Sequence, residues 1–151
     1  MTPLRFLPAL LLAALGLATG CAQSNAASAR PPQALEIKLA GYRPVNYRIA
    51  WTGTRLLYVQ EVRSGGERTT PIRPSSGAWG RFWRALERVE AWSWAPEYRP
   101  AASAPTEGLQ WQVRIRWNGH TVSSQGIGRT PQRFGDVLEA LSELLGGRPV
   151  R

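Results

Sequence analysis

Apolar and polar side chains alternate along the first half of the chain, which is the pattern of β-strands with one buried face. The alternation is clear over residues 35–39 (LEIKL) and 47–51 (YRIAW). Further strands are expected at 56–62 and 69–72, because a Ser-Gly-Gly turn (64–66) separates them. This half of the chain is therefore expected to form a series of hairpins.

The clearest hairpin lies in the second half. Residues 110–117 (QWQVRIRW) alternate strictly, and Asn118-Gly119 then supplies the two residues that a tight hairpin turn prefers. With this turn Ile115 faces Val122 and Trp117 faces His120, so the apolar face continues into a second strand. We expect His120 to pack over Trp117.

Two segments have the 3.6-residue period of amphipathic helices. The first begins at a capping serine, Ser75 or Ser76, and runs to about Val89. The second is expected to begin at a Thr130 cap with Pro131 in its first turn, and to end at Gly146-Gly147. Their apolar stripes are Trp79, Phe82, Trp83, Leu86 and Val89 in the first, and Phe134, Val137, Leu138, Leu141, Leu144 and Leu145 in the second.

These elements predict an α+β domain, an antiparallel sheet of hairpins with both amphipathic helices packed on one face. The plan of strand, glycine turn, strand and helix occurs twice, which suggests a hairpin-plus-helix pseudo-repeat. Residues 35–147 are expected to form this single domain, and residues 148–151 a C-terminal tail. Residues 91–98 are expected to be extended, and residues 99–108 (RPAASAPTEG) to form an exposed loop.

The N-terminus has a different pattern. Arg5 precedes an apolar run over residues 6–17, and Ala18-Thr19-Gly20-Cys21 follows it directly. The run is shorter than the ~20 apolar residues that cross a bilayer. This three-part organisation is that of an export signal.

With its cysteine directly after small residues, this segment resembles the signal peptides of bacterial lipoproteins. The resemblance implies cleavage after Gly20, a diacylglyceryl group on the Cys21 thiol and acylation (palmitate) of the new amine. Residues 1–20 would then be the signal peptide, and residues 21–34 the lipidated N-terminus and a flexible tether. Ala22 follows the cysteine, which in a Gram-negative host favours the outer membrane, on its periplasmic side. An ordinary signal peptide with a chance cysteine is the alternative.

Charge narrows the classes of partner. The chain carries 19 basic and 10 acidic residues, and Lys38 is its single lysine. Arginine suits carboxylate and phosphate groups, so an anionic glycan, an anionic lipid or another envelope protein is an expected partner. An exported domain has no access to nucleic acid. Cys21 is the single cysteine, so no disulfide is expected.

Catalytic residue patterns are sparse. The chain has one histidine, His120, and one aspartate, Asp136, and their spacing does not indicate a catalytic triad. No metal-ligand spacing or phosphate-binding loop occurs, so neither a metal nor another cofactor is expected. Carboxylates that could serve acid–base chemistry are Glu87 with Glu90, where ion pairing of Glu87 with neighbouring arginines is the simpler account, and Glu97 with Glu107.

Two sets of residues are candidates for a binding surface. Trp92, Trp94 and Tyr98 beside Arg99 would form an aromatic platform if the segment is extended; alternatively Trp92 and Trp94 seal the end of the first helix. Arg81, Arg84 and Arg88 form one stripe of that helix, either a solvated face or a contact with an anionic surface. The other five tryptophans are expected in the core: Trp51, Trp79, Trp83, Trp111 and Trp117.

The sequence therefore favours a lipid-anchored, non-enzymatic binding or accessory module of the cell envelope. A second hypothesis is an inhibitor or immunity lipoprotein that blocks a foreign enzyme. A cell-wall hydrolase is the third and least favoured hypothesis.

Overall fold

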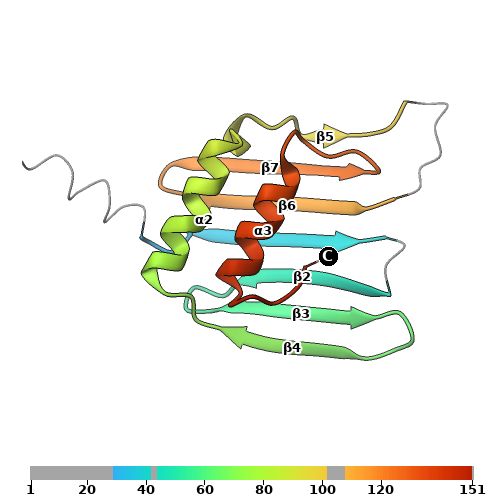
Figure 1. The fold of residues 1–151 in the computed structure, drawn as a ribbon, viewed down its shortest axis with the longest axis horizontal. Coiled ribbons are helices and arrows are strands. Elements are labelled where there is room, and N and C mark those ends of the chain that lie inside the picture. The colour runs from blue at the N-terminus through green and yellow to red at the C-terminus, as the bar shows by residue number, and fades with distance from the viewer. Residues whose placement is uncertain (1–28, 42–43, 102–107, 151) are drawn as a thin grey trace, which may run out of the picture.

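A computed structural model describes residues 29–41, 44–101 and 108–150. They form an α+β fold with one seven-stranded sheet of order β4-β3-β2-β1-β6-β7-β5 (Figure 1). Neighbouring strands pair antiparallel except β5 and β7, which are parallel, so the sheet is mixed and only mostly antiparallel. The strands are β1 (Ala34–Ala40), β2 (Val45–Trp51), β3 (Leu56–Val62), β4 (Glu67–Ile72), β5 (Glu97–Tyr98), β6 (Gln110–Trp117) and β7 (His120–Ile127).

The alternation of apolar and polar residues, together with the turn residues, predicted the β3–β4 and β6–β7 hairpins correctly. The register of β6 and β7 pairs Ile115 with Val122 and Trp117 with His120, as the two-residue turn predicts. Asn118 and Gly119 have φ angles of 48° and 81°, both in the left-handed region that a type I′ turn requires. The His120 ring is stacked on that of Trp117, with 6.3 Å between the ring centroids.

Helix α2 (Ser76–Arg88) begins where the sequence predicts. The Ser75 hydroxyl oxygen accepts a hydrogen bond from the Ala78 backbone N–H at 3.1 Å, which satisfies one of the free amides of the first turn. Val89 is the C-cap residue.

Helix α3 (Phe134–Leu144) starts later than predicted. Thr130 is not its cap: the cap position is held by Arg133, in a left-handed conformation with φ 59° and without a side-chain cap bond. Residues 131–134 form a separate turn in which the Phe134 N–H donates to the Pro131 carbonyl. The end was predicted correctly, since Gly146 and Gly147 return hydrogen bonds to the carbonyls of Glu143 and Ser142.

Both helices lie over the same face of the sheet (Figure 1). The core lies between them and that face, and it includes the alternate residues of the central strands: Leu35, Ile37 and Leu39 from β1, Tyr47 and Ile49 from β2, and Trp111, Val113, Ile115 and Trp117 from β6. Of the five tryptophans expected in the core, four are buried and Trp51 packs against them. Within the residues that the structure describes, the opposite face of the sheet carries no helix, and we call it the open face.

The segment after α2 is not extended as predicted. Ala91–Ser93 form a short 3₁₀ helix, η1, which follows a left-handed Glu90 with φ 52°. Only Glu97–Tyr98 are extended, and they add β5 to the edge of the sheet beside β7. The left-handed conformation of Glu90 changes the direction of the chain at the end of α2. The spacing of Trp92 and Trp94, two residues apart, gives no sign of this change.

The packed region is longer at both ends than the predicted 35–147. The Arg30 carbonyl oxygen accepts hydrogen bonds from the indole N–H groups of Trp83 (2.9 Å) and Trp117 (3.2 Å). At the other end Val150 is buried in the core, and the Tyr58 hydroxyl donates to the Pro149 carbonyl at 2.5 Å. Residues 148–150 are therefore part of the packed domain rather than a tail.

Candidate functional site

The open face is lined by the polar half of the strand pattern. Side chains alternate across a sheet, so the residues between the core positions of each strand point away from the helices. On β1 these are Glu36 and Lys38, and on β6 they are Gln112, Arg114 and Arg116. An antiparallel sheet with one solvated face leaves these groups free to meet a partner.

A hollow of about 330 Å³ lies on this face near the β5 edge, and we call it the open-face groove. It crosses strands β1, β6, β7 and β5 and extends to Arg99, just after β5. The groove is lined by Lys38, Ala40, Glu97, Arg99, Gln110, Trp111, Gln112, Gln125, Gly126 and Ile127. It therefore combines three glutamine amides with both signs of charge.

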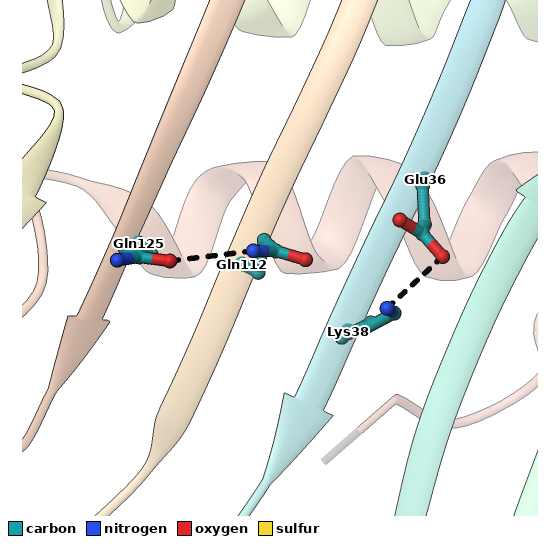
Figure 2. A network of polar contacts seen from close by, with 4 residues as sticks. All are labelled: Glu36, Lys38, Gln112 and Gln125. Atoms are coloured by element: carbon teal, nitrogen blue, oxygen red, sulfur yellow. Dashed lines mark hydrogen bonds and ion pairs between the residues drawn. The ribbon is translucent and has the colours of Figure 1, made fainter.

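Two polar contacts lie side by side at and beside the groove (Figure 2). The Gln112 amide Nε2 lies 3.3 Å from Gln125 Oε1 across the β6–β7 ladder. On β1, Lys38 Nζ lies 3.1 Å from Glu36 Oε1. All four side chains are on the side of the sheet away from helix α3, which passes behind the strands in Figure 2. Amides that bond one another still have free donors and acceptors for a ligand.

Glu97 and Arg99 form the charged rim of the groove. Glu97 Oε1 lies 2.6 Å from Arg99 Nη2. The hydrogen bond from Arg99 is the main cause that lowers the pKa of Glu97; the arginine charge and a hydrogen bond with Gln125 add to it, while partial desolvation opposes it. Glu97 is therefore ionised at neutral pH and has no proton to give as a general acid.

We expect the Arg99→Ala substitution to raise the pKa of Glu97 toward the ordinary value for glutamate, because it removes the main stabiliser of the carboxylate. In the wild type the lowered folded-state pKa contributes stability above the unfolded-state pKa, and this contribution is lost as the pH falls through the folded-state value. A ¹³C NMR titration of the carboxyl carbon measures the change. Arg63→Ala, on the exposed β3–β4 turn, is the control and should leave the Glu97 titration unchanged. An equal titration in Arg99→Ala and the wild type would contradict the assignment.

Trp111 and Gly126, which also line the groove, pair across β6 and β7 and make a close contact on the core face of the sheet. A Cβ atom on Gly126 would lie 2.6 Å from the Trp111 Nε1 and 2.7 Å from the Arg129 carbonyl oxygen. The indole N–H donates to that same carbonyl at 2.7 Å. The glycine thus lets the indole lie across β7.

The predicted aromatic platform does not form as one surface. The Trp92 ring stacks on His120 and Trp117, with ring centroids 5.1 Å and 6.1 Å apart. Trp94 instead contacts Phe134 and Trp111. Both side chains are half-buried against the core, which agrees with the alternative that they seal the end of the first helix.

The side chains of Tyr98 and Arg99 also lie in different places. The ring of Tyr98 lies 5.7 Å from that of Trp111 and packs against the core. Of the four residues predicted for the platform, only Arg99 lines the open-face groove.

The arginine stripe of α2 faces the other helix. Arg81, Arg84 and Arg88 line a surface groove together with residues of α3, three of which are acidic: Asp136, Glu139 and Glu143. Arg81 Nε lies 3.5 Å from Glu143 Oε2. The stripe is thus half of a mixed-charge cleft, which lowers its attraction for an anionic surface.

The residues considered for catalysis are not brought together. His120 is stacked at the β6–β7 turn, while Asp136 on α3 is paired with Arg133 at 2.6 Å. Glu87 is exposed and, within the part of the chain that the structure describes, has no ion pair, so local pairing with Arg84 or Arg88 is not its role. Cys21 and Glu107 lie outside the described residues.

In residues 29–41, 44–101 and 108–150, no group of three or more His, Cys, Asp and Glu side chains could hold a metal ion. Among the helices of these same segments, none is both long and apolar enough to span a membrane.

Comparison with protein-family models, with curated protein sequences and with solved structures found no match to this chain. The site must therefore be interpreted from its own residues. Sequence reasoning missed the three groove glutamines, although the polar positions of the alternating strands did signal a solvated sheet face.

Proposed function

We propose that this protein is a lipoprotein of the bacterial cell envelope, anchored through lipid on Cys21, and that it acts as a binding module rather than an enzyme. The apolar run followed by Ala18-Thr19-Gly20-Cys21 supports the anchor, and Ala22 directly after the cysteine supports the outer membrane in a Gram-negative host. Two or three acyl chains would hold the domain firmly, whereas one chain gives only marginal binding. Glu97 is ionised at neutral pH, which excludes it as a general acid, and the residues considered for a catalytic triad, His120 and Asp136, lie apart.

We propose further that the open-face groove binds a carboxylate-bearing envelope glycan, of which peptidoglycan is the abundant example. The observation that carries this proposal is the placement of three glutamines beside Lys38 and Arg99 around one hollow. Glutamine amides both donate and accept hydrogen bonds, as sugar hydroxyl and acetamido groups require. Lys38 and Arg99 are each paired with one carboxylate of the protein, and both keep further N–H donors for the carboxylates of such a polymer.

The twofold hairpin-plus-helix plan belongs to the same proposal. Hairpin β3–β4 leads to α2 and hairpin β6–β7 leads to α3, and both helices lie over one face. We propose that the two units are copies of one ancestral element. On this view only the β6 and β7 part of the groove comes from a copy, because Lys38 on β1 and Glu97 on β5 lie outside both units.

The test is co-sedimentation of the lipid-anchored protein, in detergent, with purified peptidoglycan. The double substitution Gln112→Ala with Gln125→Ala is expected to weaken binding by about tenfold or more, because each lost hydrogen bond contributes about 0.5–1.5 kcal/mol. Circular dichroism should be unchanged, since Gln125 is exposed and Gln112 is half-buried.

Gln132→Ala is the matched control, because it removes an exposed amide outside the groove. It should bind as the wild type does. Equal binding by the wild type and the double variant would exclude the groove as the glycan site. Crosslinking in intact cells that recovers one dominant protein, and loses it in the double variant, would instead establish a protein partner.

A further inference from the structure

The chain enters the fold at one defined end of the sheet. The Arg30 carbonyl is held by two indole N–H groups, Pro32 is buried, and the Gln33 N–H donates to the Arg116 carbonyl at 2.9 Å. Strand β1 starts here, at the end where the β6–β7 hairpin turns (Figure 1). We call this end of the sheet the tether end.

The packed part of the chain begins close to the proposed lipid. Arg30 is only nine residues after Cys21. Nine residues span at most roughly 32 Å, even when fully extended. Because the indole contacts fix Arg30 against the core, an anchored molecule would hold its tether end within that distance of the membrane surface.

The tether end carries an arginine cluster. Arg55 directly precedes β3, Arg73 directly follows β4, and Arg116 pairs with the first residue of β1. Arg114 lies one pleat further along the open face. We call these four residues the tether-end arginines, and all four are exposed.

Among the described residues, no carboxylate forms an ion pair with this cluster. The ion pairs found in the described residues join other groups: Lys38 with Glu36, Arg81 with Glu143, Arg99 with Glu97 and Arg133 with Asp136. Glu36, opposite Arg114 in the register, is thus already bound to Lys38. Glu61 and Glu67 face each other at the opposite end of the sheet.

Helix α2, which lies beside the tether end, does not remove this excess of positive charge. The last turn of α2 and the residue after its C-cap add Glu87 and Glu90, but the same helix carries Arg84 and Arg88. The tether end of the sheet is therefore its cationic end.

We infer that the tether-end arginines dock the domain on anionic phospholipid headgroups of the membrane that holds its lipid anchor. The inference rests on the proposed lipid anchor, because the short tether is what brings this end to the surface. Each arginine near an anionic surface strengthens docking about fivefold, and the attraction decays within a Debye length of ~10 Å. Docking by this end leaves the open-face groove, which lies toward the opposite strand ends, accessible from the periplasm.

The test uses the lipidated protein, purified from membranes and reconstituted into vesicles. One set of vesicles is phosphatidylcholine and the other is phosphatidylcholine with an equal amount of phosphatidylglycerol; each contains a trace of dansyl-phosphatidylethanolamine. Energy transfer from the tryptophans to the dansyl headgroup reports how close the domain lies to the surface. We expect stronger transfer with phosphatidylglycerol, and loss of this difference at ~1 M salt, where screening extends to ~3 Å.

Two triple variants test whether docking on anionic vesicles depends on the tether end of the sheet. Arg55→Ser with Arg73→Ser and Arg116→Ser should reduce the ratio of docked to undocked protein on the order of a hundredfold. Arg63→Ser with Arg68→Ser and Arg129→Ser removes the same charge from the opposite half of the sheet and should dock as the wild type does.

Other outcomes would overturn the inference in distinguishable ways. Equal transfer in both vesicle types, with lipid on Cys21 verified by mass spectrometry, would overturn docking and leave the anchor intact. Absence of lipid on Cys21 would overturn both. If the tether-end variant bound vesicles normally but lost binding to peptidoglycan, the glycan would be the occupant of this surface.

Discussion

Replacing Trp83 with alanine is expected to lower the free energy of unfolding by about 3–5 kcal/mol, the range observed for buried tryptophan and phenylalanine truncations. The side chain is 0% exposed and lies between two other indoles. Its ring centroid is 5.3 Å from that of Trp79 and 4.6 Å from that of Trp117. Urea denaturation followed by far-UV circular dichroism measures the loss.

Trp94→Ala is the control, because this side chain is only half-buried at the edge of the same core. It should cost clearly less than the Trp83 substitution. Trp83→Phe keeps an aromatic ring but removes the N–H that bonds the Arg30 carbonyl; Trp117 still donates there, so this loss should be smaller than that of Trp83→Ala. If Trp83→Ala lost less than 1 kcal/mol, Trp83 could not be a central element of the packing.

The second large effect is expected at Gly126. Gly126→Ala should destabilise the fold by about 2–3 kcal/mol, in the range of overpacked cores. The added methyl would lie 2.6 Å from the Trp111 Nε1 and 2.7 Å from the Arg129 carbonyl. The indole could move away only by weakening its own 2.7 Å bond to that carbonyl. Thermal unfolding and the near-UV signal of the tryptophans report both consequences.

The same glycine-to-alanine substitution at Gly135 should raise the free energy of unfolding rather than lower it. Gly135 lies in the first turn of α3, and no atom lies within 4 Å of the position of an added Cβ. Gly135→Ala is therefore expected to stabilise the protein by about 0.5–1 kcal/mol through helix propensity alone. A loss of stability at Gly135, or none at Gly126, would contradict the steric explanation.

Local patterns predicted the elements whose causes are local. The bounds of β3 and the start of α2 agree with the predictions, and the Asn118-Gly119 turn determined the register of β6 and β7. The start of α3 was predicted wrongly at Thr130, because a capping residue followed by proline also occurs in an isolated turn. The reversal at Glu90, in a left-handed conformation, has no residue signature at all.

The candidate site was harder to predict. Arg99 was identified, but the groove glutamines come from strands that are distant in sequence and adjacent in the sheet. Trp92 and Trp94 are two residues apart and were expected on one face. The 3₁₀ turn between them directs one to His120 and the other to Phe134.

The sequence alone determined the alternating strands, the two helices and their polar and apolar faces, because these depend on side-chain spacing along a single element. The apolar N-terminal run and Cys21 also belong to the sequence, and the export signal and lipid anchor that they indicate stay proposals. The tertiary structure decided which strands are neighbours, which face stays open and where Arg30 is held. It also brought Lys38, Gln112 and Gln125 to one groove and four arginines to one end of the sheet. These arrangements depend on the order of strands in the sheet, and the periodicity of a single strand carries no information about its neighbours.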